Sequence, residues 1–215
     1  MIGFVLPIYK DLKNLEAVPK IMKIYPDSKI IVIADDAESM NKAKELGAFV
    51  PYHSKKAGFG KSLCEGTCLA WFTFSCDIVV QADGDHPLEA VDTFIKKLDD
   101  ADVVVGKEVG SGAWKRSRVW SNKLIRRFIL DDVTNPTCGF VVWKSNILKK
   151  IPWNKIMSNW DVVHMELLFW AKKNGAKIIE CEFEEVPKER IYKFKRYVRW
   201  AYEFSRLLWT KHFGG

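Results

Sequence analysis

The chain has 215 residues, of which 48% are hydrophobic and 28% charged, and its net charge is +7. This length suits one well-filled core and is short for two domains, and no stretch reaches the roughly 18 apolar residues that span a bilayer. Residues 1–7 lack the basic start and cleavage site of a signal peptide and are better explained as a first strand. The positive charge favours an anionic partner, such as nucleotide phosphates, an acidic membrane surface or nucleic acid.

The five cysteines are an odd number and include no Cys-x-x-Cys pair. Cys64 and Cys68 lie one helical turn apart, which favours the core face of a helix over a metal site. Cysteines without a pairing pattern are typical of a reducing compartment, so we expect the chain in the cytoplasm.

Hydrophobic runs and amphipathic periods predict that strands and helices alternate along the chain. Alternation of this kind predicts an α/β domain with a mostly parallel sheet and helices on both faces. Strands are expected at residues 2–8, 29–34, near 50, 78–80, 101–106, 141–143 and 177–183. Helices are expected at residues 11–24, 38–46, from the loop at 55–62 to about 74, and at 88–98, 122–130 and 160–173.

Carboxylates directly follow two of the predicted strands. Asp35 and Asp36 follow the run at 29–34, and Asp83 and Asp85 follow the run at 78–80. In open α/β sheets, ligands bind at the carboxyl ends of the strands.

The second pair has the composition of a metal site. Together with Gln81, Asp83 and Asp85 supply oxygen ligands of the kind that Mg²⁺ or Mn²⁺ prefers, and such ions usually bridge carboxylates to substrate phosphates. A solvated acidic loop is the alternative explanation.

Two basic, glycine-containing loops have the composition of anion-binding segments. The loop at 55–62 contains Gly58 and Lys61 and opens a helix, whose N-terminus favours anions. It ends like a P-loop, but a lysine stands where the first glycine of that motif is required, so the P-loop is excluded. The loop at 110–118 carries an aromatic residue among basic ones and is either a lid over an anionic substrate or a solvated loop.

The C-terminal residues 193–213 have the pattern of a basic amphipathic helix rich in aromatic residues. Such a helix suits the headgroup region of a membrane. Alternatively, it packs its apolar stripe on the body of the protein. Nucleic acid is not expected, because no recognised binding module is present. The stripe consists of Tyr197, Trp200, Ala201, Phe204, Leu207 and Leu208.

A series of short motifs follows along the chain, at residues 5–9, 31–39, 58–62, 81–87, 105–107 and 137–140, with Asn14, Leu15, Gly66, Trp114, Arg118, Ser121, Glu182 and Arg190. In their order and spacing they resemble the motifs of the family 2 glycosyltransferases of GT-A fold. The resemblance covers nearly the whole chain and lies within the dolichyl-phosphate mannosyltransferase and polyprenyl-phosphate glycosyltransferase branch.

The resemblance implies a metal-dependent hexosyltransferase that takes its sugar, with inversion, from a GDP- or UDP-linked donor. Mg²⁺ or Mn²⁺ is the implied cofactor. The donor site would be formed by Pro7, Tyr9, Asp11, Asp35, Asp36, Gly58, Lys61 and Asp83, and the metal would be held by Gln81, Asp83 and Asp85.

The acceptor implied by the resemblance is a lipid phosphate. Arg118, Arg190 and Arg196, with Asp85, form the expected catalytic set, since guanidinium groups suit anionic oxygens. A phosphate is ionised at neutral pH and needs no general base. A hydroxyl of a sugar or protein would need one, and Asp161 is the candidate, although a charge at a helix N-terminus explains it equally well.

The chain departs from the family at its metal segment. Gln81 stands where an aspartate is usual and Asp85 where a glutamine is usual, so the number of oxygen ligands is kept. The change leaves open a degenerate module that binds nucleotide or membrane without turnover. A sugar-nucleotide pyrophosphorylase is disfavoured, because no glycine-rich basic signature follows the first strand. We expect a GT-A domain at residues 1–190 and a C-terminal helix at 191–215, on a chain peripherally associated with the membrane.

Overall fold

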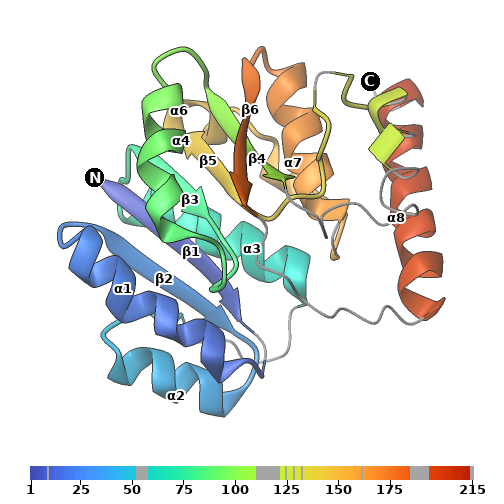
Figure 1. The fold of residues 1–215 in the computed structure, drawn as a ribbon. Coiled ribbons are helices and arrows are strands. Elements are labelled where there is room, and N and C mark those ends of the chain that lie inside the picture. Colours follow the sequence, from blue (N-terminus) through green and yellow to red (C-terminus); the bar gives the residue numbers. More distant parts are fainter. Residues whose placement is uncertain are drawn as a thin grey trace.

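The computed structural model describes residues 1–8, 10–51, 58–109, 122–123, 125–127, 129–131, 133–160, 162–184 and 194–213, with the backbone alone at 194–197 and 211–213. A six-stranded sheet in the order β2-β1-β3-β5-β4-β6 lies at its centre (Figure 1). The strands are β1 (Ile2–Ile8), β2 (Lys29–Ala34), β3 (Ile78–Gln81), β4 (Val103–Val109), β5 (Val141–Lys144) and β6 (Ile178–Glu184).

The sheet is mostly parallel, as predicted. β1 pairs in parallel with β2 and β3, and β4 pairs in parallel with β6. β5 runs antiparallel to both of its neighbours, β3 and β4. β2 and β3 are buried on both faces, and this is why their sequences are continuous β-branched runs rather than alternating patterns.

Helices cover both faces of the sheet (Figure 1). On β1, a Cβ atom built at Gly66 would come 2.5 Å from Val5 Cγ1, whereas the ring of the adjacent Phe4 lies 5.2 Å from that of Tyr25. Successive side chains therefore meet α3 on one face and the end of α1 on the other. The helices are η1 (Leu12–Glu16), α1 (Ala17–Ile24), α2 (Ala37–Glu45), α3 (Phe59–Cys68), the π-helical η2 (Leu69–Thr73), η3 (Leu88–Ala90), α4 (Val91–Lys97), α6 (Ser145–Leu148), η4 (Trp153–Lys155), α7 (Val162–Lys173) and α8 (Phe194–Phe213).

The strand predicted near residue 50 is reduced to a single bridge. Phe49 pairs with Ile31 in parallel, accepting from Val32 N–H and donating to Ile30 O, each at 2.9 Å. Pro51 follows and has no N–H with which to extend the ladder.

The helix that contains Cys64 and Cys68 runs without interruption from α3 into η2, where Phe74 N–H bonds Leu69 O at 3.0 Å. None of the five cysteines forms a disulfide. Burial raises the pKa of the Cys64 thiol to about 12 and that of the Cys68 thiol to about 11. Both thiols therefore stay protonated at neutral pH, which agrees with the predicted packing role rather than with metal binding.

The C-terminal helix α8 lies at the edge of the molecule, alongside α7 (Figure 1). Of the predicted stripe, Phe204 and Leu207 are buried, Trp200 and Leu208 are half-buried against the core, and Ala201 is exposed. The stripe thus packs on the body of the protein. In the described part of the chain, no helix combines the length and apolar character needed to cross a membrane.

Candidate functional site

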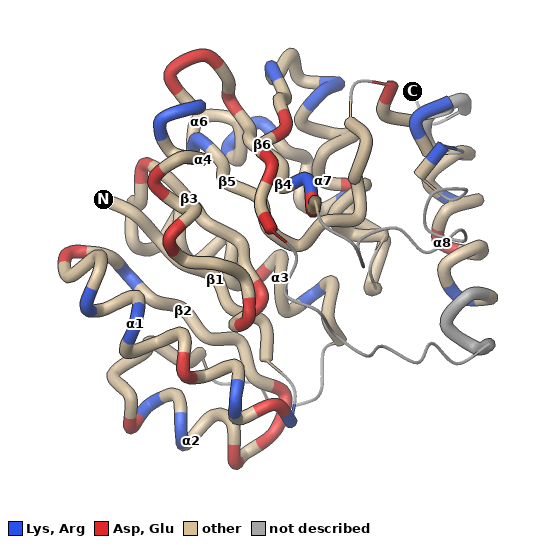
Figure 2. Tube along the Cα trace, viewed as in Figure 1, with Lys and Arg blue, Asp and Glu red and all other residues tan. Residues whose placement is uncertain are grey.

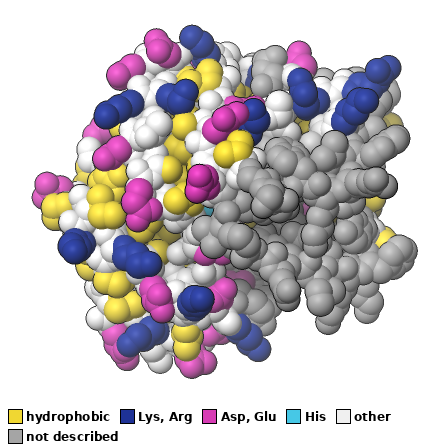
Figure 3. All heavy atoms as spheres, viewed as in Figure 1, with side chains coloured by type: hydrophobic (Ala, Val, Ile, Leu, Met, Phe, Trp, Pro, Cys, Tyr) yellow, Lys and Arg dark blue, Asp and Glu magenta, His cyan; other side chains and the backbone are white. Residues whose placement is uncertain are grey.

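The carboxyl ends of β1, β2 and β3 lie next to one another in the sheet, and the predicted carboxylates follow these ends. Figure 2 shows acidic segments where these strands end, and Figure 3 shows acidic side chains and a histidine gathered near the centre of the same face. The alternation of strands and helices thus brings polar groups from separate parts of the chain to one edge of the sheet.

Asp35, which follows β2, holds the start of α3. Its carboxylate accepts hydrogen bonds from Gly58 N–H and from the Ser62 hydroxyl, both at 3.3 Å. Gly58 has a φ of +90°, and a Cβ atom there would come 2.8 Å from Asn159 Nδ2, so both conformation and space require glycine. Two residues predicted for the donor site are therefore in direct contact.

Asp36 has a different task. Its carboxylate caps α2 by accepting Ser39 N–H at 2.9 Å, and it also accepts Lys10 N–H at 2.9 Å. Burial acts to raise the pKa of Asp36, but the hydrogen bonds from Ser39 and Lys10 outweigh it and hold this pKa below its ordinary value. Asp36 thus fixes the backbone that follows β1, where Lys10 has a φ of +52°.

Replacement of Asp36 by alanine should lower the free energy of unfolding by about 1 kcal/mol, the usual cost of losing an N-cap. Because the folded-state pKa lies below the unfolded value of about 3.9, this contribution is present above that value and is lost as the pH falls through the folded-state pKa. Urea unfolding at neutral and acidic pH measures both effects. The exposed Asp27→Ala is the control, and equal losses in the two variants would contradict the assignment.

The segment after β1 lies against the turn after β3. Asp11 accepts hydrogen bonds from Asn14 N–H at 3.4 Å and from Asn14 Nδ2 at 2.9 Å, and this cap starts η1. A Cβ atom at Gly84 would come 2.1 Å from Asn14 O. Only glycine allows this approach. The segment that carries the predicted donor residue Asp11 therefore lies next to the Asp83-Gly84-Asp85 turn.

The turn that carries the two carboxylates is closed by His86. His86 N–H donates to Asp83 O at 3.1 Å, and Asp83 N–H donates to His86 Nδ1 at 2.8 Å. The imidazole stacks on Phe140, with ring centroids 5.0 Å apart and an interplanar angle of 12°. Asp83, Asp85 and His86 each offer one potential ligand atom, all within 4.8 Å of one another.

The donor set of this turn fits a hard divalent cation. Asp83 and Asp85 offer carboxylate oxygens, and such an ion takes its remaining ligands from substrate phosphates and water. His86 Nδ1 is occupied by the Asp83 amide, so the imidazole positions the turn rather than contributing that nitrogen as a ligand.

Gln81, predicted as a metal ligand, packs against α3, and its ligand role stays a prediction. Its side chain is wholly buried, and its Nε2 donates to Thr67 Oγ1 of α3 at 2.8 Å. As the last residue of β3, Gln81 directs its side chain to the face that α3 covers. The two aspartates lie beyond the strand, whereas the amide oxygen of Gln81 is buried and accepts no hydrogen bond from the described residues.

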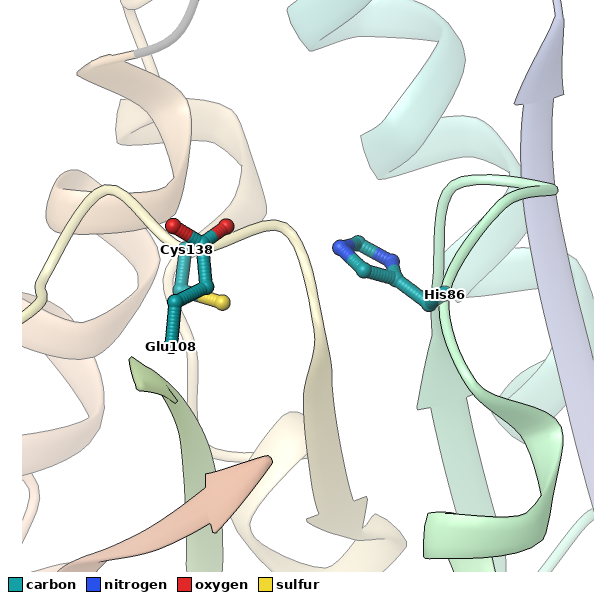
Figure 4. A group of neighbouring side chains, drawn as sticks. All are labelled: His86, Glu108 and Cys138. Carbon is teal, nitrogen blue, oxygen red and sulfur yellow. The ribbon is translucent and has the colours of Figure 1, made fainter. Parts of the chain in front are cut away.

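A second group lies on the other side of the His86 ring. His86 points toward Glu108 of β4 and Cys138 of the turn before β5, and their potential ligand atoms lie within 4.8 Å of one another (Figure 4). With the Asp83 amide on Nδ1, a neutral imidazole carries its proton on Nε2. In that tautomer the Nε2–H group faces Glu108 and Cys138 and presents them with a donor rather than with a lone pair for a metal.

The turn at 134–140 is anchored by a carboxylate that sequence reasoning missed. Glu180 of β6 accepts hydrogen bonds from Thr134 N–H at 2.6 Å, from Thr134 Oγ1 and from Asn135 N–H at 2.9 Å. Asp83 is held close to this turn, since its carboxylate oxygens lie 3.6 Å from a Cβ atom built at Gly139. The available signal was the acidic residue that directly follows the apolar pair Ile178 and Ile179 within a predicted strand.

The segment at 157–160 packs on the start of α3, a role that the sequence analysis did not predict. Its Asn159 accepts hydrogen bonds from Lys61 N–H through Oδ1 at 3.3 Å and from Gly60 N–H through the backbone oxygen at 2.9 Å. A Cβ atom at Gly60 would come 2.6 Å from Ser158 O. The exposed Lys61 side chain, predicted for the donor site, is thus carried by a helix start held from both sides.

Two buried carboxylates hold this segment in turn. Glu166 of α7 accepts Met157 N–H at 3.0 Å and Ser158 N–H at 2.7 Å. Glu203 of α8 accepts Asn159 N–H at 2.9 Å and Trp160 N–H at 3.3 Å. Burial raises the pKa of Glu203 above its ordinary value, although these amides act to lower it. Through Asn159, α8 is linked to the start of α3.

The structure describes only some of the other residues that were predicted for the site. Pro7 lies in β1, opposite Ile33 of β2. Arg196 belongs to the first turn of α8, where only the backbone is described. The predicted residues that lie outside the described part of the chain are Tyr9, Trp114, Arg118, Ser121, Asp161 and Arg190.

Comparison with known proteins adds to this geometry. No family model matches the chain. Glucosyl-3-phosphoglycerate synthase of Mycobacterium tuberculosis, crystallised with Mn²⁺, UDP and glucosyl-3-phosphoglycerate, superposes with a TM-score of 0.73 over 98% of this chain and 79% of that one, at 18% identity. The chain has the GT-A glycosyltransferase fold. The GT-A fold accounts for the carboxylates gathered at the ends of β2 and β3, where nucleotide ligands bind in α/β sheets.

Curated relatives point to the same branch as the sequence motifs. The undecaprenyl-phosphate mannosyltransferase of Micrococcus luteus is 23% identical over 207 residues, 86% of this chain and 83% of the relative. The polyprenol monophosphomannose synthase of Mycolicibacterium smegmatis is 23% identical over 206 residues, 86% of this chain and 77% of the relative. The predicted resemblance of this GT-A chain to polyprenyl-phosphate glycosyltransferases is confirmed.

Proposed function

We propose that the protein is an inverting glycosyltransferase that moves a hexose from a nucleotide diphosphate sugar to a polyprenyl phosphate at a membrane surface. The observation that carries the proposal is the pair Asp83 and Asp85 after β3, beside the contact of Asp35 with Gly58. Both curated relatives, which are named for polyprenyl acceptors, align with 86% of the chain.

The donor would lie across the ends of β1, β2 and β3. Pro7, Tyr9, Asp11 and Asp35 would bind the base and ribose, with Asp36 fixing the backbone between them. Gly58 and Lys61 would bind phosphate at the start of α3, because the positive end of the helix dipole and the exposed Lys61 side chain favour an anion there.

A divalent cation, Mg²⁺ or Mn²⁺, would be held by Asp83 and Asp85. When bound, it neutralises the charge that develops on the departing nucleoside diphosphate. His86 keeps the two carboxylates in place through its hydrogen bond with the Asp83 amide.

The acceptor phosphate would be clamped by Arg118, Arg190 and Arg196, since the guanidinium fork matches phosphate oxygens. One phosphate oxygen forms the new bond to the anomeric carbon while the bond from that carbon to the diphosphate breaks on the opposite side. No proton has to be removed from an ionised acceptor, so this chemistry needs no general base.

The domain division follows from the same proposal. Residues 1–190 would form the catalytic GT-A domain, and residues 191–215 a helix that brings the mouth of the site to the membrane. The association would be peripheral, and the site would face the compartment that supplies the nucleotide sugar.

The proposal is tested by a donor screen followed by an acceptor screen. Thermal unfolding with GDP, UDP, GDP-mannose and UDP-glucose, each with and without Mn²⁺, should show a metal-dependent rise in Tm with one base, because the ligand binds the folded state. Transfer from that donor should then be seen with a short polyprenyl phosphate and not with 3-phosphoglycerate, a sugar or a serine peptide. Nucleotide binding without transfer to any acceptor would instead support a non-catalytic module, and no shift with any nucleotide would overturn the donor site.

A further inference from the structure

Helix α8 has two apolar stripes, one buried and one largely exposed. Phe204 and Leu207 are buried, at 5% and 2% exposure. Val198, Tyr202 and Trp209 are 55%, 61% and 66% exposed. We call these three residues the outer stripe.

The outer stripe lies on a single face of the helix. Residues four and eleven positions apart fall on the same side, because eleven residues complete about three turns. Leu207 lies half a turn away from Trp209, so the buried stripe and the outer stripe face in opposite directions. Large, highly exposed apolar side chains gathered on one face are typical of an interaction surface.

Contacts of the inward face hold α8 on the body of the protein, so that the outer stripe stays exposed. Glu203, 6% exposed, accepts the N–H groups of Asn159 and Trp160, and the Arg199 guanidinium lies 3.9 Å from the centre of the Trp160 ring. Membrane docking therefore does not require α8 to leave the body of the protein.

The charges of α8 indicate what covers the outer stripe. The only acidic residue in the sequence of the helix is Glu203, and its carboxylate is buried against the body. In sequence the helix therefore carries more basic than acidic charge, and its outer stripe is aromatic, which suits the headgroup level of an anionic bilayer, where Trp and Tyr rings lie between lipid and water. The basic residues in the sequence of the helix are Lys195, Arg196, Arg199, Arg206 and Lys211.

We propose that the outer stripe of α8 docks on an anionic phospholipid surface while the opposite face stays packed on α7. This docking rests on the proposed function for its biological purpose. It adds to that function the helix face that would bring the site to a lipid acceptor. It differs from the expectation from sequence, in which the stripe of Phe204 and Leu207 would contact either the membrane or the body.

The test is co-sedimentation of the full chain with vesicles, in the absence of donor and acceptor. Wild-type protein should bind vesicles of phosphatidylcholine mixed with phosphatidylglycerol, bind phosphatidylcholine vesicles weakly, and be released as salt is raised. The double variant Tyr202→Ser, Trp209→Ser should lose binding by about tenfold or more, since the apolar area buried in the bilayer is removed.

The matched control is Phe72→Ser. Phe72 is an aromatic residue of η2 with 74% exposure, and its replacement should leave vesicle binding unchanged. Equal losses in Phe72→Ser and in the double variant, or absence of wild-type binding to anionic vesicles, would overturn the proposal. The rival partner of the outer stripe is a second copy of the chain, and sedimentation equilibrium measures whether the protein dimerises. If wild-type protein forms a dimer, the double variant does not, and neither binds vesicles, the stripe would be assigned to a dimer interface.

The two proposals fail separately. The double variant should keep wild-type transfer to a short, soluble polyprenyl phosphate and lose transfer only to acceptor embedded in anionic vesicles. If vesicle binding follows the outer stripe but no sugar is transferred, the docking surface stands and the proposed reaction fails.

Discussion

Sugar transfer should fall by about a hundredfold or more when Asp83 is replaced by alanine, because the charge on the departing diphosphate then loses its stabilisation. Asp83 is one of the two carboxylates on the turn after β3, and the neighbouring Gln81 is buried, with its Nε2 bonded to Thr67. The metal-dependent rise in Tm with the preferred nucleotide should vanish in the same variant. Initial rates with saturating donor and a series of Mn²⁺ concentrations measure the loss.

The control for this variant is Asp99→Ala, which removes an exposed carboxylate just beyond α4. Asp99→Ala should transfer sugar at the wild-type rate and keep the metal-dependent shift. Asp83→Ala should retain the wild-type Tm in the absence of ligands. Transfer close to wild type in Asp83→Ala would show that the metal is not held by this turn.

Replacement of Glu203 by alanine should cost about 2–4 kcal/mol of the free energy of unfolding, because it leaves the Asn159 and Trp160 amides without their acceptor in a buried setting. For a chain of this size, each kcal/mol corresponds to a fall in Tm of about 2–4 °C. The variant should also raise the KM for the donor, since Asn159 holds the Gly60 and Lys61 amides at the start of α3. Urea unfolding and donor kinetics measure the two effects.

Two further variants separate this role from a general loss of a helix glutamate. Glu203→Gln keeps one side-chain oxygen as an acceptor and should lose less stability than Glu203→Ala. Glu45→Ala breaks an exposed pair with Lys42 and should cost well under 1 kcal/mol with no change in KM. A Glu203→Ala protein that loses stability but keeps the wild-type KM would confine Glu203 to holding α8 and would disprove the link to the donor site.

The strands of the sheet could be predicted from the sequence because strand formation here depends on local runs of apolar residues. The runs at 29–34 and 78–80 are β-branched and apolar throughout, which is the pattern of strands buried on both faces. The antiparallel direction of β5 could not be predicted, because its apolar run at 141–143 is equally compatible with either direction. Strand direction depends on the path of the preceding chain rather than on the strand's own side chains.

The candidate site divides in the same way. Asp35 and Asp83 could be selected because a carboxylate at the end of an apolar run cannot continue the strand and must lie at its tip. Gln81 follows an apolar run just as directly, and only the position of α3, with Thr67 at 2.8 Å, shows that its amide points into the core. Residue type and spacing did not distinguish these two situations.

The sequence by itself determined the class of fold, the edge of the sheet at which the polar groups gather and the basic, amphipathic character of the C-terminal helix. Each of these follows from hydrophobic periodicity and from residues that stop a strand. Only the tertiary structure decided that Glu203 faces inward to bind Asn159 and that Trp209 faces outward. A helical period specifies which residues share a face, but the choice of the face that is buried depends on what the neighbouring elements offer, here backbone amides at 159–160 that need a buried acceptor.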